Sequence, residues 1–142
     1  MTKRRILLVA NETIEAPGVH EALGLGAEVR VVAPGLNSPL RHWASDEDGA
    51  RLAAAQRLTR FLRRLQLADI EASGRVGDAD PLLAIEDELR TFDADEIVIS
   101  THPEGRSRWL AHHLVDRACE RFDLPVIHVV VDVKTGSEYL AA

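Results

Sequence analysis

Four short apolar runs and one weakly alternating segment, Ile70–Val76, are separated by longer amphipathic segments along the chain, and this alternation constrains the fold more than any other feature. The runs are rich in Val and Ile, as buried parallel strands are. We expect strands at Arg5–Ala10, Glu28–Ala33, Ile70–Val76, Glu96–Thr101 and Val126–Asp132. Because strands that alternate with helices imply right-handed crossovers, the sequence predicts an α/β fold whose parallel sheet is covered by helices on both faces.

Apolar residues that recur every three or four positions predict helices between these strands. In the longest helix, one face comprises Ala50, Ala54, Leu58, Phe61, Leu62 and Leu65, and the opposite face Arg57, Arg60, Arg63 and Arg64. The next helix is expected to begin with Asp80 as its N-cap and Pro81 in the first helical position. Its buried stripe comprises Leu82, Ile85, Leu89 and Phe92. A short helix is expected at Val19 to Leu25, and a loose tail at Lys134 to Ala142.

Length and charge exclude several classes of protein. A chain of 142 residues is expected to form a single domain, residues 1–142, with a real core. The net charge of −6 argues against non-specific binding to nucleic acid, so the arginines of the longest helix are interpreted as a solvated face. No apolar run approaches the ~20 residues of a membrane span. The first run ends at Ala10, too early for a signal peptide, so a cytoplasmic protein is expected.

The junction between the fourth strand and the last helix is the strongest candidate site. The apolar face of this helix comprises Leu110, Leu114, Ala118 and Phe122, with Ala111, Val115 and Cys119 beside them. The single Cys119 is therefore predicted to be a small buried hydrophobe in a reducing compartment. A polar loop from Ser100 to Arg106 precedes the helix, and Ser107 is the predicted N-cap.

An anion is predicted to bind at this junction. The free N–H groups and the dipole of a helix N-terminus favour anions, and open α/β sheets bind ligands at the carboxyl ends of their strands. The expected donors are the first-turn amides beginning at Ser107, with charge from Arg106 and Arg108. Thr101 and His102 lie at the end of the strand, where His102 either contacts the ligand or bonds a loop carbonyl. The alternative is that Ser107 only caps its own helix and that both arginines are solvated or paired to Glu104.

The ends of the first and third strands are expected at the same edge of the sheet. Asn11 follows the first strand, and Gly77 and Asp78 follow the third. We expect these residues to face the same crevice and to hold a base and a ribose, with Asp78 bonding a ribose hydroxyl.

Four segments of the chain resemble the universal stress protein family. They are Ile6-Leu-Leu-Val-Ala, Gly77-Asp78, Ala94-Asp95-Glu96-Ile-Val-Ile-Ser and Leu124-Pro-Val-Ile-His-Val-Val. The resemblance covers nearly the whole chain. It implies a five-stranded parallel sheet in the order 3-2-1-4-5, usually paired into homodimers. Many members of the family bind ATP through an Asp after the first strand and a glycine-rich motif after the fourth.

The chain departs from the ATP-binding members at both of these places. Asn11 stands where the family often has Asp, and an amide offers a different set of donors and acceptors. Of the glycine-rich motif only Gly105 is present to allow a close approach of backbone to phosphate. The family's ATP motif is not intact, so ATP or AMP is a possible ligand that would be held in a different geometry, by backbone N–H groups and the two arginines.

Two classes of function therefore stay open, with an enzyme third. The first is a stress-response or signalling module that binds an adenine nucleotide or another phosphorylated ligand. The second is a homodimeric protein-interaction module of the same fold that binds no nucleotide. The sequence has no P-loop, no Gly-x-Gly-x-x-Gly and no Gly-x-Ser-x-Gly. Adjacent His112 and His113 point about 100° apart on a helix and cannot chelate one metal ion together.

A homodimer is expected through the fifth strand, Val126 to Val131. This strand is β-branched and contains no lysine, and as the sheet edge it would present unpaired backbone groups. Trp43 and Trp109 each have two interpretations. Trp43 either covers the site or packs between subunits, and Trp109 lies either in the core or at the border of the site.

Overall fold

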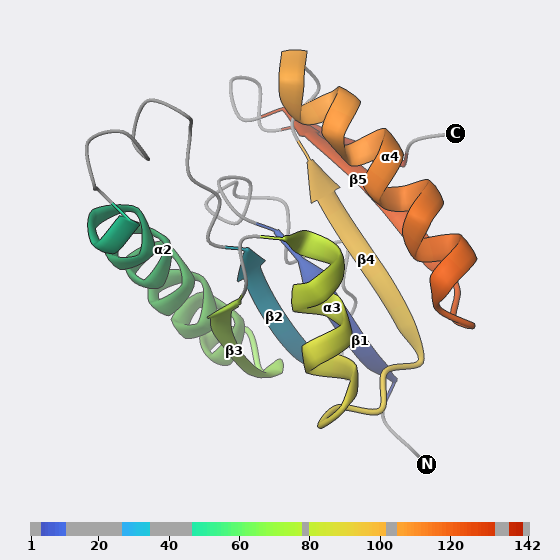
Figure 1. The fold of residues 1–142 in the computed structure, drawn as a ribbon. Coiled ribbons are helices and arrows are strands. Elements are labelled where there is room, and N and C mark those ends of the chain that lie inside the picture. Colours follow the sequence, from blue (N-terminus) through green and yellow to red (C-terminus); the bar gives the residue numbers. More distant parts are fainter. Residues whose placement is uncertain are drawn as a thin grey trace.

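Five parallel strands form the centre of the structure in the predicted order (Figure 1). The computed structural model describes residues 4–10, 27–34, 47–77, 80–101, 105–132 and 137–140. The strands are β1 (Arg5–Val9), β2 (Glu28–Pro34), β3 (Glu71–Gly77), β4 (Glu96–Thr101), β5 (Val126–Asp132) and β6 (Ser137–Leu140). They pair in the order β3-β2-β1-β4-β5-β6, and β1 to β5 are parallel. The predicted α/β fold and the strand order 3-2-1-4-5 are confirmed.

The sixth strand corrects the prediction of a loose tail. β6 runs antiparallel to β5, with Val129 opposite Leu140 and Asp132 opposite Ser137. The tail prediction is therefore wrong for this segment, because the hydrogen-bonding edge of β5 stabilises an extended strand beside it. It also follows that β5 is not the edge of the sheet, which was the reason for expecting a dimer there. The homodimer itself stays a prediction.

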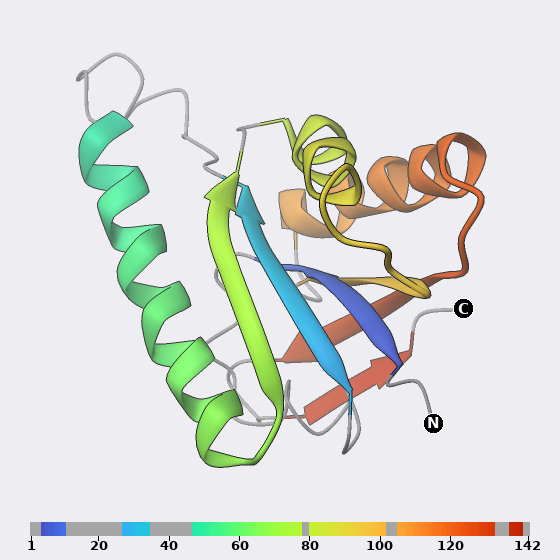
Figure 2. The ribbon, with the colours of Figure 1, turned by 90° about the horizontal axis from the view of Figure 1, so that it is seen from below.

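The helices lie on both faces of the sheet (Figure 2). They are α2 (Glu47–Leu67), α3 (Pro81–Leu89) and α4 (Gly105–Arg121). α2 covers one face, whereas α3 and α4 cover the other. The expected helix at Val19 to Leu25 and the side chain of Trp43 lie outside the described residues. In the described part of the chain, no helix is long and apolar enough to cross a membrane.

Two apolar layers form the core because successive side chains of each strand point to opposite faces. The layer beneath α2 contains Leu8, Val31, Val98, Leu58, Phe61 and Leu65. The layer beneath α3 and α4 contains Leu7, Val32, Ile97, Ile85 and Ala118. These positions confirm the described part of the apolar faces predicted for the three helices, whereas the side chains of Ala50, Ala54, Leu110 and Ala111 lie outside the described residues.

The predicted start of α3 is also confirmed, whereas the burial of Cys119 is not. Asp80 has extended backbone angles and its Oδ1 accepts a hydrogen bond from the amide of Leu82 at 3.0 Å, with Pro81 in the first turn. Cys119 is exposed although its neighbour Ala118 is fully buried. One helical step turns a side chain by about 100°, which is enough to carry Cys119 out of the apolar face.

Candidate functional site

The carboxyl ends of the parallel strands gather at one edge of the sheet. Val9, at the end of β1, pairs with Ile99 of β4, and Gly77, at the end of β3, pairs with Pro34 of β2. The strand order reverses direction between β1 and β4. From β1, the chain adds β2 and then β3 on one side of the sheet, and it then crosses to the other side, where it adds β4 and β5. Such a switch point is where open α/β sheets bind ligands.

The structure places part of the predicted site at this edge. Gly77 ends β3, Thr101 ends β4, and the backbone of Gly105, Arg106, Ser107 and Arg108 forms the first turn of α4. β4 and α4 are therefore consecutive, with α4 beginning close after the end of β4 in sequence. Asn11, Asp78 and His102 lie outside the described residues, as do the side chains of Arg106, Ser107, Arg108 and Trp109.

The start of α4 differs from the prediction. The helix begins at Gly105, so Ser107 lies within the first turn and is not the N-cap. The first-turn N–H groups, which have no partner within a helix, therefore begin at Gly105 and not at Ser107. The correction moves the predicted donor group two residues closer to β4.

The absent side chain of Gly77 allows α3 to pack closely on the sheet. A Cβ atom at this position would lie 2.7 Å from Cγ2 of Val32 and 3.0 Å from Cβ of Ala84. Real Cβ atoms do not approach other carbon atoms so closely, and the helix would have to shift. Gly77 thus has a packing function in addition to the ligand contact predicted for it.

A buried ionic network at the other end of α3 was not predicted. Glu88 is only 1% exposed and forms ion pairs with two arginines. Its Oε2 accepts from Nη1 of Arg30 at 3.0 Å, and its Oε1 accepts from Nε of Arg75. Arg30 also donates from Nε to Oγ of Ser73 at 2.8 Å. The network joins α3 to β2 and β3, and it satisfies the charge that burial would otherwise penalise.

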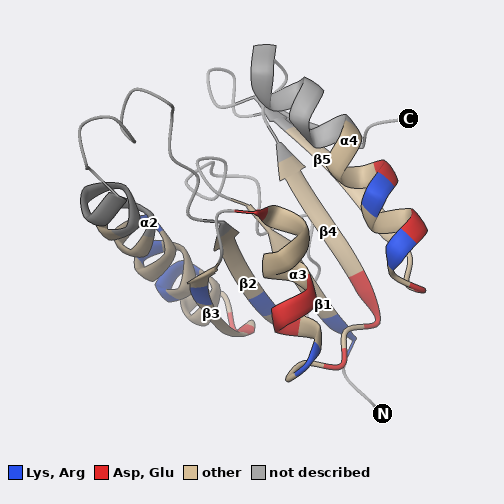
Figure 3. Cartoon of the chain, viewed as in Figure 1, with Lys and Arg blue, Asp and Glu red and all other residues tan. Residues whose placement is uncertain are grey.

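The same network continues to the central strand. The guanidinium groups of Arg5 and Arg30 lie 4.9 and 5.0 Å from the ring centroid of Phe92. Arg5 also pairs with Glu28 at 3.2 Å. Figure 3 shows the result as basic residues on β1 and β2 beside acidic residues at the end of α3. Cation–π contacts and ion pairs thus replace aliphatic packing at this end of the layer.

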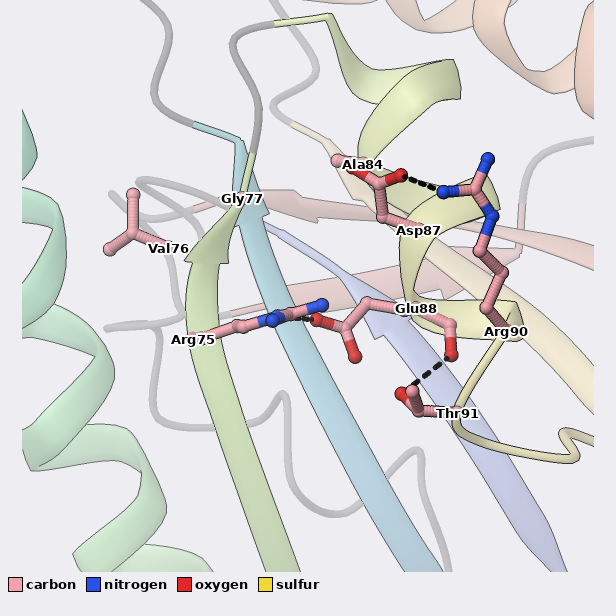
Figure 4. Close-up of a pocket in the computed structure, with 8 residues that line it drawn as sticks. All are labelled: Arg75, Val76, Gly77, Ala84, Asp87, Glu88, Arg90 and Thr91. Carbon is pink, nitrogen blue, oxygen red and sulfur yellow. Dashed lines mark hydrogen bonds and ion pairs between the residues drawn. The ribbon is translucent and has the colours of Figure 1, made fainter.

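A cavity of about 450 Å³ lies next to this network, between β3 and α3 (Figure 4). β3 contributes Arg75, Val76 and Gly77 to its lining, and α3 with the turn after it contributes Ala84, Asp87, Glu88, Arg90 and Thr91. Arg75 reaches from β3 toward Glu88, and Arg90 pairs with Asp87 at 3.3 Å. The cavity therefore has polar walls with charges of both signs.

A solved structure with the same architecture decides the fold family. It is a universal stress protein family protein from Arabidopsis thaliana with AMP bound, and it aligns with 93% of this chain and 94% of its own at a TM-score of 0.54. The present chain has the universal stress protein fold. The identity between the two sequences is 11%, and by sequence neither a family model nor a curated protein matches. The similarity therefore lies in the fold.

In the part of the chain that the structure describes, His, Cys, Asp and Glu side chains nowhere form a group of three or more that could hold a metal ion. Most carboxylates around the cavity and the network are instead paired with arginine, as for Glu28, Asp87 and Glu88.

Proposed function

We propose that this domain is a stress-response or signalling module that binds an adenine nucleotide, or another phosphorylated small ligand, at the carboxyl ends of β1 and β4. The observation that carries the proposal is the match in fold to a universal stress protein that contains AMP. In this proposal the protein acts in the cytoplasm as a binding module, and an enzyme stays the third candidate.

The position of the proposed site follows from the topology. β1 and β4 are adjacent parallel strands at the point where the strand order reverses, and such a point opens a crevice between the following loops. The N-terminus of α4 comes directly after β4, so its free N–H groups and positive dipole end favour a phosphate there.

The ligand contacts are assigned by position in the chain. Gly105 allows the backbone to approach the phosphate, and Arg106 and Arg108 supply charge. Asn11 follows β1, where its amide can bond the edge of a base, and Asp78 follows β3, where its carboxylate can accept from a ribose hydroxyl. Thr101 and His102 complete the border of the site at the end of β4.

The proposal is tested by calorimetric titration with AMP, ADP and ATP. The wild-type protein should bind at least one of them, and Arg106→Ser combined with Arg108→Ser should weaken binding without unfolding the domain. Arg63→Ser is the matched control, because Arg63 is an exposed arginine of α2 on the other side of the sheet. Equal binding by the double variant and the control would show that Arg106 and Arg108 do not contribute to the site.

The competing candidate is a homodimeric interaction module that binds no nucleotide. The loss of the family's glycine-rich ATP motif, of which only Gly105 is present, favours this candidate. Pairing a second copy along the backbone of Val126 to Val131 would require β6 to leave the edge of β5. Mass spectrometry of the small molecules released from the purified, denatured protein separates the candidates, because this module should release no nucleotide.

A further inference from the structure

We propose that the cavity between β3 and α3 is a second ligand site, which binds a small phosphate- or carboxylate-bearing metabolite. Among the described residues, its lining comes from β3, from α3 and from the turn after α3, and includes no residue of β1 or β4. It is therefore separate from the crevice proposed above for a nucleotide, although Gly77 borders both. A volume of about 450 Å³ suits a small metabolite.

The charges around the cavity favour an anion. Glu88 is the only carboxylate that pairs with Arg75 and Arg30 among the described residues, and it takes one hydrogen bond from each. In the lining itself Arg75 and Arg90 balance Glu88 and Asp87, and Arg30, which pairs with Glu88 from outside the lining, adds one further positive charge beside the cavity. The second acidic residue of the lining, Asp87, is matched by Arg90 and does not cancel this further charge.

Arg75 is held in a position that leaves its best donors available. Its Nε–H donates to the buried Glu88, and within the described part of the chain its terminal amino groups form no hydrogen bond. These two groups match the oxygens of a carboxylate or phosphate in a bidentate arrangement. Because Glu88 is fixed by burial and by Arg30, the orientation of Arg75 is determined before a ligand arrives.

The carbonyl groups at the C-terminus of α3 do not repel an anion from the cavity. The carbonyl groups at a helix C-terminus carry partial negative charge, which would repel an anion if they faced the cavity unbonded. Here the carbonyl of Asp87 accepts from the amide of Arg90, and that of Glu88 accepts from the amides of Thr91 and Phe92 at 3.1 and 3.0 Å. The hydroxyl of Thr91 also donates to the Glu88 carbonyl.

The test is an NMR titration of the nitrogen-15-labelled protein with inorganic phosphate and, separately, with succinate. Binding should produce saturable shifts at the amides of Gly77 and Thr91 and at the side-chain Nε–H of Arg75. If phosphate alone saturates these signals, the metabolite is phosphorylated; if succinate alone does, it is a carboxylate. No saturable shift with either anion would overturn the proposal.

Variants locate the site. Arg75→Lys keeps the charge but loses the fork of donors, and it should weaken binding about tenfold, the scale of one charge-assisted hydrogen bond. Arg90→Ser keeps the proposal testable if Arg75→Lys does not fold, because the Arg90 side chain is 68% exposed and its loss should leave the domain folded. It should also weaken binding. Equal weakening by Arg63→Ser would show a non-specific charge effect and would contradict the site.

The proposals for the two sites can be tested independently of each other. Arg106→Ser combined with Arg108→Ser should leave the shifts of Gly77, Thr91 and Arg75 unchanged in the phosphate titration. Shifts confined to the first turn of α4, and abolished by this double variant, would assign anion binding to the nucleotide crevice alone and refute the second site.

Discussion

Replacing Glu88 by Gln should lower the free energy of unfolding by about 3 kcal/mol, and the reason lies in the two arginines that it joins. The amide of Gln can accept from only one of them, and its NH2 group then points a donor at the other. The Arg30 side chain is 26% exposed, so its charge-assisted hydrogen bond is expected to contribute ~1.5–3 kcal/mol. The Arg75 side chain is 58% exposed and water screens it, so its bond contributes only ~0–1 kcal/mol.

The measurement is urea denaturation followed by circular dichroism, which gives the free energy of unfolding by linear extrapolation. Glu86→Gln is the matched control on the same helix. Glu86 pairs with Arg121 at 2.7 Å, but both side chains are partly exposed, so its loss should cost less than about 1 kcal/mol. If the two variants are equally stable, the network around Glu88 does not stabilise the fold as reasoned here.

Three further predictions concern packing, capping and the sheet edge. Gly74→Ala should destabilise more than Gly77→Ala, within the ~1–3 kcal/mol typical of overpacking, because its Cβ would lie 2.5 Å from the backbone oxygen of Val31; equal denaturation midpoints would contradict this. Asp80→Ala should cost about 1 kcal/mol in the same assay by removing the N-cap of α3, whereas an unchanged midpoint would show that the cap is dispensable. Deleting residues 133–142 should expose β5 and increase association in light scattering, and an unchanged mass would show that β6 does not protect this edge.

The strands were predictable because local sequence determines them. Leu7, Leu8, Val31 and Val98 lie in runs whose composition permits little except a buried strand, and these residues do form the two core layers. The order of the strands required the family resemblance as well, because apolar runs do not say which strand lies beside which.

The ionic network around Glu88 was not predictable, because it depends on residues that lie far apart in the sequence. Glu88 occupies a helical position where a carboxylate usually meets water, and its partners Arg30 and Arg75 lie 58 and 13 residues away in sequence. No local pattern signals such a pairing. The one available hint was that Arg30 interrupts the apolar strand β2, which is unusual for a face covered by helices.

β6 and the start of α4 show how neighbours override local patterns. Ser137–Leu140 contains Glu138 and is too short to stand out as a strand, yet pairing with β5 orders it. Ser107 is a favourable N-cap residue by type, but α4 begins at Gly105. Of the predicted ligand contacts, Asn11, Asp78 and His102 lie outside the described residues, so the nucleotide site stays a prediction.

Calorimetric titration of the wild-type protein with AMP tests the central claim most directly. The account predicts saturable binding of one nucleotide per chain, with a thermal shift to match, since a ligand at about 100 times its dissociation constant stabilises a protein by ~2.7 kcal/mol. The absence of both heat and thermal shift with AMP, ADP and ATP at millimolar concentration would contradict nucleotide binding and favour the interaction module.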